Sequence, residues 1–329
     1  MTGFLLVGSS PADLGLMTDS TVNSAHFDPN YTQRAVYNPF GIDSTSWKVK
    51  VEPEGGSRDL WYHVYFAGIG GNVGVGSGMW ACYARDANDV IRAGWIGTGA
   101  RTAAARAIGD STVTGGNFDM TSTRFPVDVN IHVEPDKIVT EVYKSGTVVS
   151  RAEAATSTDI GPLKSFHFGP IRANAGNFAD QITAQSEFIV TDGLPTVSMR
   201  LIQRLPDSPG VYSDMQGSYT NLADPNPAAG IVGNADGQRM SWGLSPVGAT
   251  LGPAAIAAVL GRFTNSRMLG SPTRVNQFLR QDGADYDSPS HRTGLRKTDM
   301  DSWSVNPATG QKWVTSDFLD LEVGVRVTD

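Results

Sequence analysis

The amino-acid sequence predicts an all-β protein built from two β-sandwich or jelly-roll domains in tandem. Its 329 residues include 37 glycines and 18 prolines, whereas only 18% are charged, a balance typical of strands joined by turns. Short apolar segments recur with turn residues between them, at the spacing of roughly 8–12 residues found in sandwiches and jelly rolls. Helix signals are scarce, and 40% hydrophobic residues are enough for a packed core.

The strands of the first half follow from their residues. Trp47–Pro53 alternates and ends at a turn, and Leu60–Phe66 is rich in aromatic side chains. The runs MWACYAR and VIRAGWIG flank the turn-forming DANDV, which predicts a hairpin. Phe125–Pro135 alternates cleanly, with Val127, Val129, Ile131 and Val133 on one face and Asp128, Asn130 and His132 on the other. The segments DKIVTEVYKSGTVVS, SFHFGPI and SEFIVTDG continue the series of strands.

The second half is less regular. Leu194-Pro195 is a natural break, so we expect a first domain over 1–194 and a second over 195–329. Gly252–Phe263 has helical propensity, but its flanking Gly and Pro and its neighbours favour a strand. Near the end, a helical turn capped by Ser316 is expected before a closing strand, Val323–Thr328.

The charge of the chain argues against nucleic acid and anionic lipid as partners, and its single cysteine is expected to be structural. The net charge is −7 and the pI is near 5.2, which argues against nucleic acid because phosphate binding needs a basic face. No run of Lys or Arg indicates anionic lipid, and the apolar FLLV near the start is too short to be a signal peptide or a membrane span. The single cysteine, Cys82, lies in an apolar run and is expected to be a buried small hydrophobe.

The glycine-rich stretch FAGIGGNVGVGSGMW, from Phe66 to Trp80, looks at first like a phosphate-binding loop. A dinucleotide fingerprint fails because Val73 stands where the third glycine is needed and a strand follows where a helix is required. A P-loop fails because no Gly-Lys-Ser/Thr follows. We therefore expect no cofactor, and we interpret the stretch as an assembly-contact or surface loop. The residues of this loop are Gly68, Gly70, Gly71, Asn72, Gly74, Gly76 and Gly78.

Catalytic and metal signatures are equally weak. Asp320 and Glu322 are the nearest approach to a glycosidase carboxylate pair, but they lie near a predicted helix-to-strand junction, where placement on a shared face is doubtful. No G-x-S-x-G elbow occurs, and the five histidines are scattered. The residues Asp86, Asn88 and Asp89 could ligate calcium or form Asx-turns, and NADGQ is a similar oxygen-rich turn. The sequence thus predicts a non-enzyme with no assigned metal site.

Tryptophans are the remaining binding candidates. Most lie in predicted strands, which favours core packing. Trp303 and Trp313 lie in turn-rich stretches and are the candidate interface aromatics.

The order of these segments resembles structural proteins of tailed phages that carry a concanavalin A-like, laminin-G-like jelly roll. In the first half the resemblance rests on LWYHVYF, on the hairpin WACYARDANDVIRAGWIG and on FPVDVNIHVEPDKIVTEVYKSGTVV. Its most specific part is QSEFIVTDGLPTVSMRLIQRLP. In the second half it rests on GSYTNLADPNPAAGIVGNADGQRMSW and WSVNPATGQKWVTSDFLDLEVGVRVT. The Ala-rich ARTAAARAIG and the glycine-rich loop depart from the pattern.

The resemblance implies a homo-oligomeric virion component that contacts other virion proteins and is carried in the released particle. It favours the tail (tip, baseplate or fibre) and a part in host attachment, with a host surface glycan as a further partner. A capsid decoration or head-fibre protein is the first alternative, and a carbohydrate-active enzyme is the second.

Overall fold

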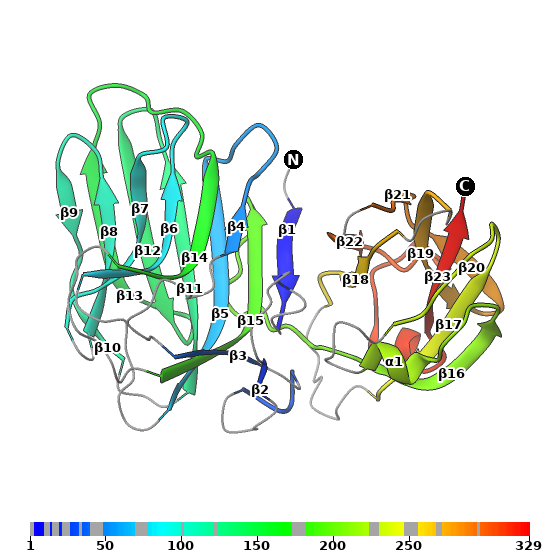
Figure 1. Ribbon diagram of the computed structural model, residues 1–329. Helices are drawn as coiled ribbons and strands as arrows, with labels where there is room; N and C mark the ends of the chain where they lie inside the picture. Colours follow the sequence, from blue (N-terminus) through cyan, green and yellow to red (C-terminus); the bar gives the residue numbers. More distant parts are fainter. Residues whose placement is uncertain are drawn as a thin grey trace. The chain divides into compact units, whose positions relative to one another are not determined.

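The computed structural model describes residues 3–9, 14, 20–21, 27–32, 35–39, 49–69, 78–99, 102–120, 124–172, 182–223, 230–246, 256–267, 272–294 and 297–329. The chain forms two compact units, Met1–Leu201 and Ile202–Asp329. Both consist of antiparallel sheets, so the predicted all-β class is confirmed (Figure 1). The described helices are too short or too polar to cross a membrane.

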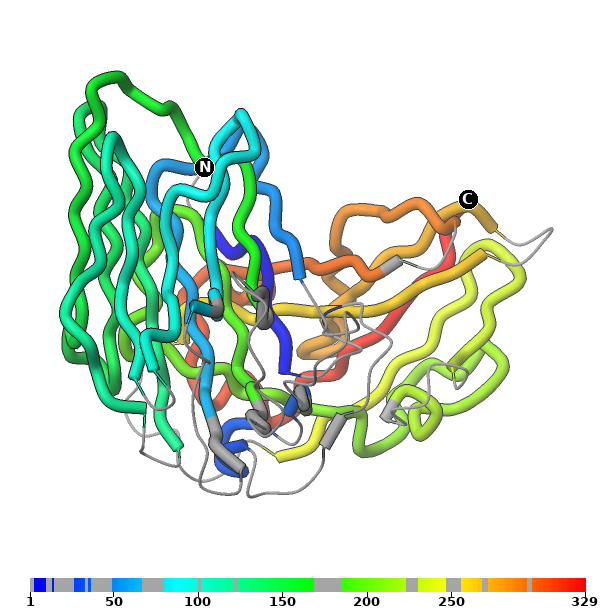
Figure 2. Tube along the Cα trace, turned by 60° about the vertical axis from the view of Figure 1, so that its left-hand side comes forward, coloured from blue at the N-terminus to red at the C-terminus, as the bar shows by residue number. Residues whose placement is uncertain are grey.

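The first unit contains a sheet with eight strands among its described residues. Its strands in spatial order are β13 (Thr147–Ala155), β12 (Lys137–Lys144), β11 (Arg124–Val133), β5 (Asp59–Ile69), β15 (Ile182–Asp192), β3 (Ala35–Pro39) and β2 (Ser20–Thr21). Strand β1 (Gly3–Gly8) also pairs with β15. Figure 2 shows the long strands of this unit running side by side as tubes.

A second sheet faces the first, and the described part of it has seven strands. In spatial order they are β10 (Phe118–Asp119), β8 (Thr102–Ile108), β7 (Ile91–Gly97), β6 (Met79–Arg85), β14 (Ser165–Arg172) and β4 (Val49–Val51), with β9 (Thr112–Thr114) paired to β8. Aromatic rings from the two sheets meet in the core, where Tyr62 of β5 stacks on Phe168 of β14 with centroids 5.1 Å apart. The unit is therefore a β-sandwich.

Sequence patterns located most of these strands. The predicted hairpin is confirmed as β6 and β7, which pair antiparallel. The alternation of Phe125–Pro135 is also confirmed, because the four apolar residues of β11 are buried in the core. Cys82 is fully buried as expected, and burial raises the pKa of its thiol to about 12.

The second unit is organised around one sheet with six described strands. These are β16 (Pro206–Ser213), β17 (Arg239–Leu244), β23 (Glu322–Thr328), β19 (Arg274–Gln281) and β20 (Ala284–Asp287), with β21 (His291–Arg292) paired to β19. A two-stranded sheet is formed by β18 (Val259–Asn265) and β22 (Lys297–Trp303), and α1 spans Tyr219–Ala223.

The predictions for the second unit hold in outline. Of the predicted strand Gly252–Phe263, residues 259–263 belong to β18, residues 256–258 are not in a strand, and residues 252–255 lie outside the described part. The helical turn before the closing strand is a 3₁₀ turn, η2 (Thr315–Phe318). Its cap differs from the expected Ser316, because the carboxylate of Asp317 accepts the Val314 N–H at 2.9 Å.

The expected boundary at 194/195 differs from the division of the compact units after Leu201. Residues beyond Leu194 remain attached to the first unit by side-chain contacts. The hydroxyl of Thr196 donates to Asp128 at 2.9 Å, and Arg200 forms an ion pair with Glu187. The Leu194-Pro195 break therefore comes a few residues before the structural boundary, and the residues between them belong to the first unit.

Candidate binding site

The six-stranded sheet of the second unit has one apolar and one polar face, because side chains alternate along each strand. Met240, Trp242, Val325 and Val327 form a core cluster on the apolar side. The opposite face carries residues of the other parity, among them Arg239, Arg326 and Asn276, which are aligned across β17, β23 and β19.

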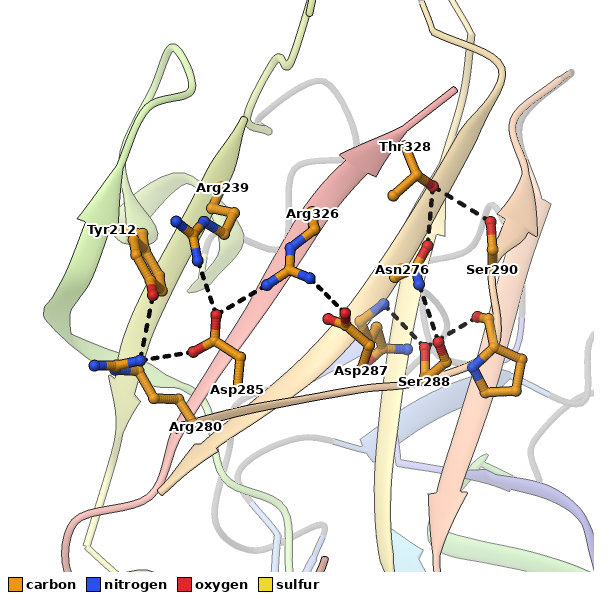
Figure 3. A network of polar contacts seen from close by, with 12 residues as sticks. Tyr212, Arg239, Asn276, Arg280, Asp285, Asp287, Ser288, Ser290, Arg326 and Thr328 are labelled. Atoms are coloured by element: carbon orange, nitrogen blue, oxygen red, sulfur yellow. Dashed lines mark hydrogen bonds and ion pairs between the residues drawn. The ribbon is translucent and has the colours of Figure 1, made fainter. Parts of the chain in front are cut away.

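One carboxylate organises this polar face. Asp285 of β20 accepts hydrogen bonds from Arg239 at 3.0 Å, from Arg326 at 2.9 Å and from Arg280 at 2.7 Å (Figure 3). Burial tends to raise the pKa of Asp285, but the hydrogen bonds from Arg280 and Arg239 outweigh it and hold the pKa below its ordinary value. The three guanidinium groups are thus fixed by one shared partner.

An aromatic pair lies between these charges. The guanidinium of Arg239 lies 3.7 Å from the ring centre of Tyr212, and the Tyr212 hydroxyl accepts a hydrogen bond from Arg280 at 3.2 Å. Tyr212 meets Phe278 edge to face, and Phe278 is fully buried although it belongs to the polar face. There is room for the Phe278 ring because it lies over Gly324, which has no side chain. A Cβ added to Gly324 would lie 2.2 Å from Cζ of Phe278.

The network continues toward the far end of β19. Asn276 donates to the Ser288 carbonyl at 3.0 Å, and Thr328 donates to Asn276 at 3.0 Å (Figure 3). Ser290 lies 3.3 Å from the Thr328 hydroxyl, and its own hydroxyl accepts from Nε of Arg274 at 2.7 Å. The polar face therefore ends at Arg274, which is held in place by its neighbours.

Arg274 lines an open hollow at this end of the sheet. The hollow has two adjoining compartments that share Arg267 and Thr273. The first, of about 430 Å³, is also lined by Asn234, Ala235, Asp236, Pro272 and Asp329, and we call it the acid compartment. The second, of about 400 Å³, is also lined by Arg274, Arg292 and Thr293, and we call it the arginine compartment. Both volumes fall in the range of small-ligand sites, roughly 300–1,000 Å³.

A second charged cluster lies on the outer face of the eight-stranded sheet in the first unit, and we call it the clasp. It consists of Asp28, His63, Asp128, Glu187 and Arg200. Nε and Nη2 of Arg200 each donate to a different oxygen of Glu187 at 2.7 Å, and Nη2 also donates to Asp28 at 3.0 Å. This bidentate geometry is the strongest form of an arginine–carboxylate pair.

The interior of the clasp is shielded from water. Glu187 is 0% exposed, His63 and Asp128 are each 1% exposed, and Nδ1 of His63 lies 2.8 Å from Asp128. Burial by itself lowers the pKa of His63, but hydrogen bonds to Asp128 and Glu187 raise it to about 9. Burial also opposes the charge on Glu187, yet Arg200 and His63 keep its pKa below the ordinary value. Because its interior is buried, we assign the clasp a structural role: it holds the segment that carries Arg200 against the sheet.

The structure places some of the predicted site residues and not others. Residues 70–77 lie outside the described part, so Gly70, Gly71, Asn72, Gly74 and Gly76 have no described position. The two flanking glycines of the loop are described. Gly68 is the last residue but one of β5 and lies opposite Thr183, and Gly78 precedes β6 with a φ of 79°. The contact role of this loop stays a prediction.

The two candidate interface tryptophans lie against each other. Trp313 is 3% exposed in a core cluster with Leu279 and Leu321, and its indole N–H donates to the Trp303 carbonyl at 2.8 Å. Trp303 is half-buried against the same cluster. The burial of Trp313 favours a packing role for it over an interface role.

Asx-turn geometry accounts for the DANDV turn. Asp86 accepts the N–H groups of Asn88 at 2.9 Å and Val90 at 3.0 Å, and it is paired with Arg92 at 2.7 Å. An arginine on this carboxylate leaves it poorly suited to calcium. No group of three or more His, Cys, Asp or Glu side chains in the described ranges is arranged to hold a metal.

The carboxylates considered for glycosidase chemistry are in different settings. Asp320 is exposed, whereas Glu322 accepts hydrogen bonds from Ser241 at 2.7 Å and from the Val211 N–H at 3.0 Å. Glu322 is thus engaged in the hydrogen bonding of the polar face.

The sequence patterns did not identify the hollow. In RVNQFLRQ only Arg274-Val275-Asn276 alternates polar and apolar residues, and Gln277 and Phe278 then break the pattern, so the signal for a polar sheet face was weak. Arg267 and Arg292 lie in short segments without periodicity, and only the pairing of β19 with β21 brings Arg292 opposite Arg274.

Comparisons with known proteins give only distant likeness. No family model matches the chain, and no curated protein matches it. Among solved structures, the binding domain of botulinum neurotoxin DC in complex with SialylT has a TM-score of 0.38 at 10% identity, over 97% of this chain and 80% of that one. The binding domain of Paraclostridial mosquitocidal protein 1 has a TM-score of 0.36 at 10% identity, over 57% of this chain.

The chain spans 48% of the mosquitocidal domain's length. The cellulose-induced protein Cip1 has a TM-score of 0.31 at 11% identity, over 54% of this chain and 98% of that one. Likeness at these scores is too low to transfer a ligand or an activity.

Proposed function

We propose that this protein is a non-enzymatic structural component of a tailed-phage particle that binds carbohydrate through the hollow of its second unit. The observation that supports carbohydrate binding is the polar lining of the hollow. Asn234 and Asp236 offer amide and carboxylate groups, and Thr273 adds a hydroxyl between the compartments. Such groups match sugar hydroxyls, which both donate and accept hydrogen bonds.

The openness of the hollow sets the expected strength of binding. Its described lining contains no aromatic ring, so recognition depends on hydrogen bonds and charge in contact with water. Individual contacts of this kind are weak, and useful affinity requires several copies acting together. A homo-oligomer in a particle provides those copies, because linked sites gain roughly 10²–10⁴ in avidity. The binding role and the proposed virion role therefore support each other.

The binding proposal is tested with immobilised glycans and the purified full-length chain. We expect wild-type protein to be retained on a subset of glycans and Asp236→Ala to weaken retention at least about fivefold, by loss of one charged hydrogen-bonding partner. Asp207→Ala, which removes an exposed carboxylate outside the hollow, is the matched control. Equal retention of wild type and Asp236→Ala would contradict this assignment. Glycans recovered after incubation should be intact, and shortened products would contradict the non-enzymatic role.

The location is tested separately, with labelled antibody on intact particles. Label on the tail is expected for a tip, baseplate or fibre component. Label on the capsid would instead support a decoration or head-fibre protein, and absence from purified particles would refute the virion role.

A further inference from the structure

We infer that the arginine compartment accepts the carboxylate of an acidic sugar, an inference that rests on the proposed carbohydrate-binding function and specifies its ligand class. Three arginines, Arg267, Arg274 and Arg292, line this one compartment together with two threonines. The protein as a whole carries a net charge of −7, so the compartment is a local concentration of positive charge against the overall balance.

The strand pairing places two of these arginines opposite each other. Arg274 of β19 and Arg292 of β21 are direct cross-strand partners. Like charges directly opposite each other destabilise a sheet. Arg267 belongs to the same group because its backbone N–H donates to the Gly294 carbonyl at 2.8 Å, just beyond β21. A bound anion between these side chains would turn the repulsion into two or three favourable contacts.

Two of these arginines, Arg274 and Arg292, have the freedom that a ligand requires. Arg274 is held by Ser290 through Nε at 2.7 Å and through Nη2 at 2.9 Å, and no described residue accepts a hydrogen bond from its Nη1. Arg292 is exposed, and it forms no ion pair with any described carboxylate. The guanidinium of Arg274 is therefore fixed in position and keeps Nη1 as a donor for a ligand. Arg292, its cross-strand partner, can move to contact the same ligand.

The chemistry of the donors favours a planar anion. A guanidinium group matches a carboxylate through two parallel N–H to oxygen bonds. The remaining sugar hydroxyls would face Thr273 and the acid compartment, where Asn234 and Asp236 lie. The two compartments together thus distinguish a charged end from a hydroxyl-bearing end of one sugar residue.

The test uses three immobilised probes at equal density: methyl β-glucuronide, methyl β-glucoside and glucose 6-sulfate. The first two differ only in a carboxylate against a hydroxymethyl group. We expect the full-length chain to bind the glucuronide at least about tenfold more tightly than the glucoside, which corresponds to about 1.4 kcal/mol. The preference should shrink as salt is raised. Arg292→Ala should abolish the preference, and Arg292→Lys should keep only part of it.

Arg151→Ala is the control, because it removes an arginine that is 52% exposed on the first unit. Unchanged thermal unfolding of Arg292→Ala would show that the variant is folded. Equal binding of glucuronide and glucoside would overturn the inference and leave the carbohydrate-binding function standing. Tighter binding of the sulfate than of the glucuronide would overturn the carboxylate assignment. Binding of none of these probes, nor of any glycan in the wider set, would overturn both proposals.

Discussion

Replacing Arg200 by alanine removes the partner of a carboxylate that has no contact with water. In the folded protein Glu187 is 0% exposed, and two 2.7 Å hydrogen bonds from Arg200 satisfy its oxygens. After the replacement, Glu187 would keep only the Leu201 N–H at 3.3 Å and the more distant His63 ring, whose Nε2 lies 3.9 Å away. An ordinary surface ion pair has no such consequence, because water replaces the lost partner.

The magnitude follows from this burial. Removing one partner of a buried ion pair costs about 3–5 kcal/mol, because the remaining charge is left uncompensated. Arg200 also lies 3.5 Å from the ring centre of Tyr31, which adds a cation–π contact to the loss. Arg151→Ala is the matched control, since Arg151 pairs with Glu141 and Glu153 while 52% exposed. We expect that control to cost less than about 1 kcal/mol.

The assay is equilibrium unfolding in urea, followed by tryptophan fluorescence. The transition of the first unit should move to lower urea in Arg200→Ala, while that of the second unit should stay in place. The double replacement Arg200→Met with Glu187→Leu should recover part of the loss, because no unpaired charge remains. A loss below about 1 kcal/mol in Arg200→Ala, or equal effects of Arg200→Ala and Arg151→Ala, would refute the reasoning.

Three further predictions concern both units. The pKa of His63 is about 9 in the folded state against 6.5 ordinarily, so its stabilisation is complete below pH 6.5 and is lost as the pH rises through 9. Urea midpoints at pH 6 and pH 9.5 should show this loss, and Asp128→Asn should reduce the difference. Gly324→Ala should destabilise the second unit by about 1–3 kcal/mol in thermal unfolding, because the new Cβ would overlap the ring of Phe278. Trp313→Ala should cost about 3–5 kcal/mol in the same unit, and retention of the wild-type midpoint would contradict its core role.

Local patterns predicted the strands well because burial in a sandwich follows the alternation of side chains. The apolar residues of β11 are buried as their spacing indicates. The same pattern placed Asp128 on the opposite face, and it does lie there, but it is 1% exposed. A periodicity argument cannot detect this, because the covering residue, Thr196, comes from 68 positions further along the chain.

The candidate binding site was harder to predict than the strands. Trp313 lies in a turn-rich stretch, yet its indole is buried because the chain folds back so that its N–H reaches the Trp303 carbonyl. The hollow depends on the pairing of β19 with β21, which has only two residues and no recognisable pattern. Sites built from short, irregular segments leave little trace in sequence periodicity, and strand Arg274–Gln281 beside them does not alternate strictly either, because Asn276 is followed by Gln277 and Phe278 by Leu279.

The clasp also determines where the polypeptide can be cut. A fragment ending at residue 194 would lack Thr196 and Arg200, and would leave the carboxylates of Asp128 and Glu187 without those partners. A fragment ending at Leu201 would retain both. On the other side, Arg204 donates to the Leu244 carbonyl at 2.8 Å and therefore belongs with the second unit. Separate expression of the two halves, or grafting of either onto another scaffold, should accordingly divide the chain between Arg200 and Arg204 and not at the Leu-Pro break.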